Sequence, residues 1–253
     1  MSQLLSQYLG PFGGGGGGGA TLVAQHVNAS NRTDQIPGTF EAATGLTISS
    51  AADRMVLAQC NLMAVGATQS LASISATWGT PSRTLGTGTA MSFIGGLNLS
   101  GATSSRPRVA LFALAAPSTG AGTVQITFGP NDSGATIVDL FELTGADQDV
   151  GNIIFNTSAA SGSSFTSRAV SLTGVPDNSA LIGGWALQSG NYAAEFSADS
   201  GSLMTGATGT SSFSDVSAAS LYQELTTGGS LSRTVSWSTS TLVAACLAAI
   251  PPA

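Results

Sequence analysis

The chain has 253 residues and a formal net charge of −6, and only 8 % of its residues are charged, against about 25 % in an ordinary soluble domain. Gly, Ala, Ser and Thr together supply 134 residues, all seven basic residues are arginine, and His26 is the one histidine. These numbers exclude enzymes that need a lysine, and metal sites built from several histidines. They predict a β-rich, non-enzymatic protein without a cofactor or a nucleic-acid partner.

The first 20 residues form a separate unit of the sequence. A short apolar patch is followed by an unbroken run of seven glycines, which has no side chains to bury. Such a run acts as a flexible tether or as backbone that passes closely between neighbours. We assign residues 1–50 to an N-terminal arm with strands at Thr21–Val27 and Phe40–Ile48. The patch and the run consist of Leu4, Leu5, Tyr8, Leu9, Phe12 and Gly13 to Gly19.

From about Ala52 the pattern is regular. Short apolar runs, several of them alternating apolar with polar residues, are separated by turns rich in Gly, Ser, Thr and Pro, which is typical of antiparallel strands. We therefore predict an all-β fold, an antiparallel two-sheet β-sandwich of the jelly-roll type over residues 51–253. The candidate strands are Arg54–Val65, Leu71–Trp78, Arg83–Leu85, Ala90–Leu97, Arg108–Leu114, Gly122–Phe128, Thr136–Leu143, Ile153–Phe155, Phe165–Leu172, Ala180–Leu187, Ala194–Phe196, Ser220–Leu225, Leu231–Trp237 and Thr241–Ile250.

The order of several segments resembles a family of jelly-roll-like β-sandwich domains in the virion structural proteins of tailed phages, also found in some bacterial surface proteins. The segments that carry the resemblance are DRMVLAQCNL, SISATWGTPSRTL, RVALFALAAPSTGAGTVQITF, VDLFELTGADQ, ALIGGWALQSG and RTVSWSTSTLVAACLAAI. The resemblance implies a capsid decoration protein or head fibre that is located in the virion. Its sandwich would be displayed, and its N-terminal arm would attach it to a phage capsid or tail protein. No catalytic motif comes with this family.

Three kinds of catalytic or metal site were weighed. Asp147, Asp149 and Asn152 offer oxygen ligands at the spacing of a calcium loop, but they are also ordinary turn formers. His26 lies in the arm, and no G-x-S-x-G motif accompanies it. The glutamates that a glycosidase would need are scattered over different elements. They are Glu41, Glu142, Glu195 and Glu224. We therefore predict neither a catalytic site nor a metal site.

A sugar-binding site is the main alternative. Trp78 stands where a predicted strand meets a turn, and Tyr192 lies in a predicted loop, so we expect both side chains to be exposed. With Asp147 they form our candidate ligand-binding set, and they would suit a tail-tip or tail-fibre protein that recognises host surface glycan. Trp185 and Trp237 lie in apolar runs and are predicted to belong to the core.

Low charge also bears on assembly. A surface with few charges favours association, and we expect a homo-oligomer, with a trimer favoured.

Cys60 and Cys246 are interpreted as buried thiols, and a disulfide between them remains open. No stretch of about 20 apolar residues occurs, so no membrane insertion is expected. The N-terminus lacks a basic signal-peptide region, which favours assembly in the host cytoplasm.

Overall fold

The computed structural model describes residues 19–30, 38–64, 71, 74–81, 84, 86–99, 106–128, 136–188, 196–209 and 216–253. Every strand pair in these ranges is antiparallel. The all-β prediction is confirmed, and none of the described helical residues forms a helix long and apolar enough to cross a membrane. The elements are β1 (Thr21–Ser30), β2 (Gly38–Ile48), β3 (Met55–Ala64), β4 (Ser75–Gly79), β5 (Thr89–Ala90), β6 (Ser92–Asn98), β7 (Arg106–Ala115), β8 (Gly120–Phe128), β9 (Thr136–Thr144), the 3₁₀ helix η2 (Val150–Asn152), β10 (Ile154–Val175), β11 (Ala180–Gln188), β12 (Ser197–Ala198), β13 (Ser202–Gly209), β14 (Val216–Glu224) and β15 (Gly229–Ile250).

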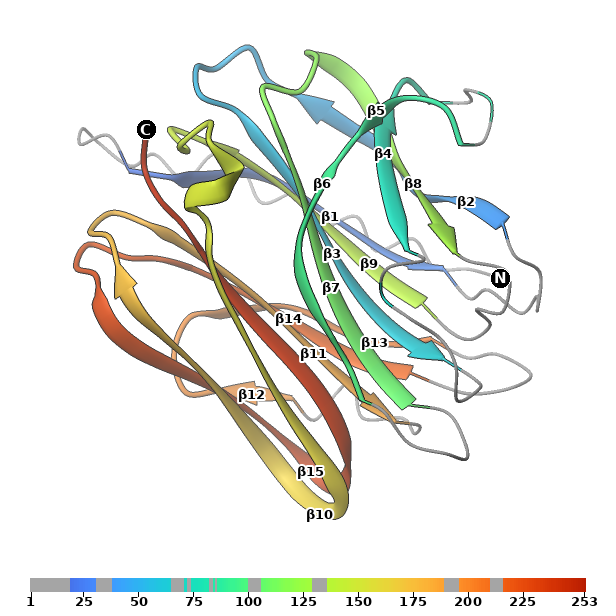
Figure 1. The fold of residues 1–253 in the computed structure, drawn as a ribbon, viewed down its shortest axis with the longest axis vertical. Coiled ribbons are helices and arrows are strands. Elements are labelled where there is room, and N and C mark those ends of the chain that lie inside the picture. The colour runs from blue at the N-terminus through green and yellow to red at the C-terminus, as the bar shows by residue number, and fades with distance from the viewer. Residues whose placement is uncertain are drawn as a thin grey trace.

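The first nine strands form an antiparallel β-sandwich of the jelly-roll type, as the sequence predicts. Sheet A has the order β1-β9-β3-β7-β6, and sheet B has the order β2-β8-β4-β5. Strands β1 to β4 alternate between the two sheets, and β7, β8 and β9 alternate back, which is the winding of a jelly roll with β6 added at one edge. Figure 1 shows the two sheets facing each other in the upper right half of the molecule.

The central strands of sheet A, β9, β3 and β7, are buried on both faces. In β3, Val56, Ala58 and Cys60 belong to the core shared with sheet B, whereas Met55 and Leu57 belong to a core on the opposite side. Side chains of a strand alternate between its two faces, so a strand with both faces covered is apolar almost throughout. This explains why most residues of the segment that begins at Met55 are apolar, with Gln59 and Asn61 as the polar exceptions.

The other face of sheet A packs against sheet C, which is built from the C-terminal part of the chain. Sheet C has the order β10-β15-β11-β14-β13, with β12 paired to β15. Strands β10 and β15 each have 22 residues and pair along their length, with register shifts near Phe165. Figure 1 shows this ribbon bending at its lower end and running back beside itself. The Arg168 Nε–H donates to Ser158 Oγ at 2.6 Å, so the two halves of β10 are in contact.

The bend gives the C-terminal unit its own core. The front half of the ribbon contains the start of β10 and the end of β15, and it forms one layer with β11, β14 and β13. The returning half contains the end of β10 and the start of β15, and it covers the outer face of that layer. Buried residues from both layers meet between them, among them Leu172 and Val235 from the returning half and Trp185 and Leu221 from the front layer. The Trp185 Nε1–H donates to the Arg168 carbonyl across this core at 2.9 Å. The molecule is therefore a jelly roll fused to a second, smaller sandwich.

This architecture corrects the boundary that we expected at residue 50. Strand β1 pairs with β9 in sheet A, and β2 pairs with β8 in sheet B. Residues 21–48 are therefore part of the jelly roll and not of an arm. The second correction concerns residues 51–253, which we expected to form one sandwich, whereas the C-terminal strands form a unit of their own.

Candidate functional site

The expected anchoring residues lie mostly outside the described residues, namely Leu4, Leu5, Tyr8, Leu9, Phe12 and Gly13. Gly19 is half-buried, and its carbonyl oxygen is only 2.6 Å from where a Cβ on Gly145 would stand. Ala20 is buried, and its amide donates to the Asn178 carbonyl at 3.1 Å. The chain thus joins the folded body at the connection between the two units.

That connection, residues 145–153, is bound to both units. The Ala146 amide donates to the Asp53 carbonyl of the jelly roll at 3.1 Å. The next amide, of Asp147, donates to the Pro251 carbonyl that follows β15, at 2.9 Å. Because neighbouring residues are fixed from opposite sides, the connection holds the two units in one relative position.

The carboxylate of Asp147 stabilises this connection. One oxygen accepts the Asp149 amide at 2.9 Å, and the other accepts the Asn152 side-chain amide at 2.6 Å. These hydrogen bonds, the backbone one first, lower the pKa of Asp147. Asp149 in turn caps η2 through the Gly151 amide. This arrangement supports the turn interpretation, and the described residues include no group of three or more His, Cys, Asp or Glu side chains that could hold a metal ion.

Trp78 does not have the exposure that we expected. Only 2 % of its surface is accessible, and it lies in the core between sheets A and B. Its indole ring lies directly against Gly122 of β8, where a side chain would overlap the ring. The prediction of an exposed Trp78 is therefore wrong: Trp78 pairs with Val124 of β8, and Gly122, two residues along that strand, has no side chain and leaves room for the indole in the core.

The other aromatic residues divide as follows. Trp185 and Trp237 are buried in the core of the C-terminal unit, which confirms their predicted place. Tyr192 lies outside the described residues. Among the candidate sugar-binding residues, only Asp147 therefore has a described side chain near the surface, and both of its oxygens accept internal hydrogen bonds.

The carboxylates considered for glycoside hydrolysis are not brought together where they are described. Glu142 is buried, and one of its oxygens accepts both the amide and the hydroxyl of Ser49, at 2.8 and 2.7 Å. Glu224 is exposed at the end of β14 and accepts the Tyr222 hydroxyl at 2.7 Å. The side chains of His26, Glu41 and Glu195 lie outside the described residues.

A buried polar cluster lies between sheets A and C, and sequence reasoning missed it. It consists of Gln59, Asn61, Asp139, Ser220 and Cys246, the first four of which are completely inaccessible. Ser220 Oγ donates to Asp139 Oδ2, and Asn61 Nδ2 donates to Ser220 Oγ at 3.4 Å. Cys246 Sγ–H donates to Gln59 Oε1 at 3.2 Å. The cluster thus connects strands of the jelly roll to strands of the C-terminal unit.

Gly184 makes room for this cluster. It pairs with Ser220 on one side and with Cys246 on the other, so it sits in the middle of the polar row of sheet C. A Cβ at Gly184 would lie 2.3 Å from Gln59 Nε2 and 2.7 Å from Asn61 Oδ1. Buried polar groups that satisfy one another fix one relative placement of the elements that carry them. The cluster therefore specifies how the two units dock.

Both cysteines are free thiols, and both are buried. Cys60 points into the core between sheets A and B, whereas Cys246 joins the polar cluster on the other side of sheet A. Burial raises the pKa of Cys246 to about 12, and burial together with the nearby Asp139 carboxylate also raises the pKa of Cys60. The interpretation as buried thiols is confirmed.

We expect the free energy of unfolding to fall as the pH rises above 9. Because the folded-state pKa of Cys246 lies above its ordinary value of 9.0, the buried thiol stabilises the protein below pH 9, and this stability is lost as the pH rises toward the folded-state pKa. Each such thiol contributes a slope that approaches about 1.4 kcal/mol per pH unit. Urea titrations between pH 8 and 10.5 should show a shallower slope for Cys246→Ala than for the unmodified chain. An equal slope in the two proteins would contradict this assignment.

Comparisons with known proteins do not place the chain in a family. No family model and no curated protein matches it. Weakly similar solved structures include the crystal structure of Cucumber Necrosis Virus, with 9 % identity over 92 % of this chain and 96 % of that chain, at a TM-score of 0.25. The cryo-EM structure of T=1 Penaeus vannamei nodavirus has 10 % identity over 91 % and 99 % of the two chains, at a TM-score of 0.23. Likenesses this low carry no argument, so function is argued below from the chain itself.

Proposed function

We propose that the chain is a non-enzymatic structural protein of a virus particle. The observation that carries this proposal is the construction of the molecule, a jelly roll joined to a second sandwich by a connection bound on both sides. Such a body holds its shape under load and presents two fixed outer surfaces. A fold hosts many functions, so the proposal rests on this rigid coupling together with the surface chemistry described next.

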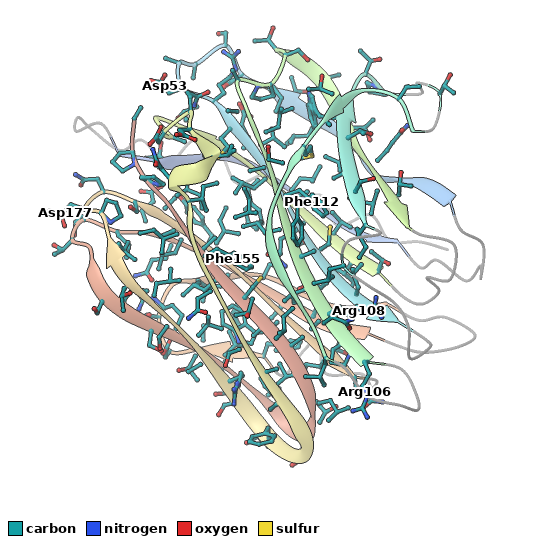
Figure 2. All side chains as sticks on the ribbon, in the orientation of Figure 1. Asp53, Arg106, Arg108, Phe112, Phe155 and Asp177 are labelled. Carbon is teal, nitrogen blue, oxygen red and sulfur yellow. The ribbon has the colours of Figure 1, made fainter. Side chains whose placement is uncertain are left out.

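The distribution of charge supports assembly. Asp53 and Asp177 lie at one end of the molecule, and the half-buried Arg106 lies at the opposite end, where Arg108 is buried (Figure 2). Only 8 % of the chain is charged, so few charges remain for the flanks of the sheets. Uncharged flanks do not repel one another, and they lose less hydration energy than charged flanks would when they meet. This favours self-association side by side, and we keep a trimer as the proposed state.

The finer proposal is a capsid decoration protein or head fibre of a tailed phage, attached by residues 1–18. It is supported by the place where Gly19 joins the body, beside the rigid connection between the units. A partner attached there would hold both units in a fixed position relative to itself. The alternative, recognition of host surface glycan by a tail-tip protein, now depends chiefly on Tyr192, since Trp78 is buried.

Removing residues 1–18 is expected to abolish attachment without unfolding the protein. The cut must fall before Gly19, because Ala20 is buried and hydrogen-bonded to Asn178. The full chain and a chain that starts at Gly19 are produced in cells that release particles, and the particles are pelleted through a sucrose cushion. We expect the full chain in the pellet and the shortened chain in the supernatant with an unchanged circular dichroism spectrum.

A matched control keeps the length of the arm and removes only its apolar side chains, by Leu4→Ser, Leu5→Ser and Leu9→Ser. If attachment depends on these side chains, this variant also remains in the supernatant. Equal recovery of the shortened chain and the full chain in the pellet would refute the anchoring role. Binding of the full chain to host glycan, but not to particles, would favour the receptor-binding alternative.

A further inference from the structure

The interface between sheets A and C changes character along the strands. The half next to the connection is apolar on both sides and contains large side chains. Among them are Met55, Leu57 and Phe141 of sheet A and Ile182 and Ile250 of sheet C, all buried in one core. Large apolar side chains contribute most of the free energy gained by burial. This half of the interface therefore holds the two units together strongly.

The other half of the interface, which we call the far half, contains the buried polar cluster and small residues. Two rows of sheet C face sheet A here, and no side chain in them is larger than that of cysteine. Across β14, β11 and β15 these rows are Ser220, Gly184, Cys246 and then Ala218, Ala186, Ala244.

Sheet A presents polar groups to these rows. A Cβ at Gly184 would lie against Gln59 and Asn61, and Ser220 donates to Asp139. Two larger apolar residues, Val109 and Ile137, complete this half of the interface. Small side chains bury little apolar area, and polar groups regain hydration when they are exposed. Separating the far half therefore costs less free energy than separating the apolar half.

Each unit also has a core that does not depend on this interface. The jelly roll has the core between sheets A and B, which contains Trp78 and Phe112. The C-terminal unit has the core between its front layer and the returning ribbon, which contains Trp185 and Leu221. A part of a protein with its own core can stay folded while a neighbouring contact opens. The far half can thus open without unfolding either unit.

The connection lies where a hinge for this opening is needed. The chain crosses from one unit to the other once, between β9 and β10. Hydrogen bonds from Ala146 to Asp53 and from Asp147 to Pro251 keep the two units together at this point. Figure 1 shows the 3₁₀ helix of the connection at the same end of the molecule as the C-terminus. The covalent link and the strong apolar contacts therefore lie at the same end of the interface.

We propose that the two units form a clamshell, in which sheets A and C swing apart at the far half about the connection while both units remain folded. The closed form is the resting state, fixed by the hydrogen bonds of the buried polar cluster, and the open form is rarely populated. Opening exposes Gln59, Asn61 and Cys246, and it changes the angle between the two outer surfaces of the molecule. This inference goes beyond the proposed function and does not depend on it.

The two buried thiols test the opening, because they lie on opposite sides of sheet A. Cys246 lies in the far half of the interface, whereas Cys60 points into the core between sheets A and B. The native protein is incubated with iodoacetamide, and peptide mass spectrometry follows the labelling of each thiol. We expect an opening constant at least about tenfold larger for Cys246 than for Cys60. Labelling of Cys246 should depend weakly on urea, because opening exposes little surface, whereas labelling of Cys60 should show the full urea dependence of unfolding.

Gly184→Ala should favour the open form. Its Cβ would lie 2.3 Å from Gln59 Nε2 and would push the sheets apart in the far half. We expect labelling of Cys246 to become about tenfold faster or more, with the weak urea dependence retained. Gly183→Ala is the matched control, because its Cβ would lie 2.7 Å from the Trp185 ring on the other face of β11. Any faster labelling in this control should have the steep urea dependence of unfolding.

A circular dichroism spectrum identical to that of the parent shows that Gly184→Ala folds. If it does not fold, Ser220→Ala replaces it, since this change removes the hydroxyl that donates to Asp139. We expect Ser220→Ala to accelerate the labelling of Cys246 in the same way.

Hydrogen exchange distinguishes the opening from unfolding of the C-terminal unit. The amides of β11 pair with β14 and β15 inside sheet C, so their hydrogen bonds survive when the two units part. The opening constant from exchange of these amides should be at least about tenfold smaller than the opening constant from labelling of Cys246.

Four results would overturn the inference. They are equal opening constants for the two thiols, a urea dependence of Cys246 labelling as steep as that of Cys60, exchange of the β11 amides together with labelling of Cys246, and unchanged labelling of Cys246 in a folded variant of the far half. None of these results decides the proposed function, which is tested by pelleting with particles.

Discussion

Trp185→Ala is expected to lower the free energy of unfolding by about 3–5 kcal/mol, the range for removing a buried tryptophan. The indole of Trp185 is completely inaccessible and fills the core between the front layer and the returning ribbon of the C-terminal unit. Its Nε1–H is the hydrogen-bond donor to the Arg168 carbonyl at 2.9 Å. Alanine leaves a cavity and a carbonyl without this donor, so the returning ribbon loses one of its attachments to the front layer.

The measurement is guanidinium unfolding followed by circular dichroism and by fluorescence of the remaining tryptophans. Trp185→Phe is the control, because it keeps most of the ring volume and loses mainly the hydrogen bond, for a loss of about 1–2 kcal/mol from that bond. Because the buried polar cluster between sheets A and C couples the two units, circular dichroism and fluorescence should report one shared unfolding transition in the parent protein. A loss below about 1 kcal/mol for Trp185→Ala would show that the returning ribbon is held by other contacts.

Alternation of apolar and polar residues predicts most strands of the jelly roll, because one residue in two faces a core. It does not predict how many sheets are stacked. Gln59 and Asn61 stand at alternate positions of β3, which is the pattern of a strand with one face in water. In the structure sheet C covers that face. Asn61 donates to Ser220, and Gln59 accepts from Cys246, within the buried polar cluster. Only the long-range packing distinguishes a solvated polar side chain from one in a buried polar cluster.

The long ribbon shows another limit of sequence reasoning. The runs Ile153–Phe155 and Phe165–Leu172 were predicted as separate strands, because the small polar residues between them read as a loop. In the structure the backbone stays extended through Ile154–Val175 and bends without breaking. Ser and Gly are equally compatible with a turn and with a bent strand, so local composition does not separate the two. The bend is fixed by contacts with the front layer, among them those of Trp185.

The arm shows why a composition boundary is not a fold boundary. Residues 21–48 are polar and contain turn signals, and they were therefore grouped with the glycine run. Their partners are β9 and β8, about a hundred residues later in the sequence. The local pattern predicts two strands here, but it does not show which sheet they join, since a strand's stability comes from its partners in that sheet.

Gly122→Val is expected to destabilise the jelly roll by about 3 kcal/mol, at the upper end of the usual range for an overpacked core. A Cβ at Gly122 would lie 1.8 Å from Trp78 Cζ2 and 2.3 Å from Cη2, far inside van der Waals contact. Trp78 cannot move aside easily, because it is 2 % exposed and is surrounded by the core of sheets A and B. Ala121→Val, which adds two methyl groups on the exposed side of β8, should change stability by less than about 0.5 kcal/mol.

A double-mutant cycle between Gly122 and Trp78 tests the cause directly. Trp78→Phe shortens the ring where the overlap occurs, and it breaks no hydrogen bond to the part of the chain that the structure describes, where the buried Trp78 Nε1 has no partner. If the clash is the mechanism, Gly122→Val should cost less in the Trp78→Phe background than alone, with an interaction energy of about 1–2 kcal/mol. Strictly additive losses would mean that Gly122 is required for its backbone and not for the space that it leaves. The cycle therefore distinguishes a glycine required for its backbone conformation from a glycine required for the space beside it. It also tests whether that space allows Trp78 to be buried.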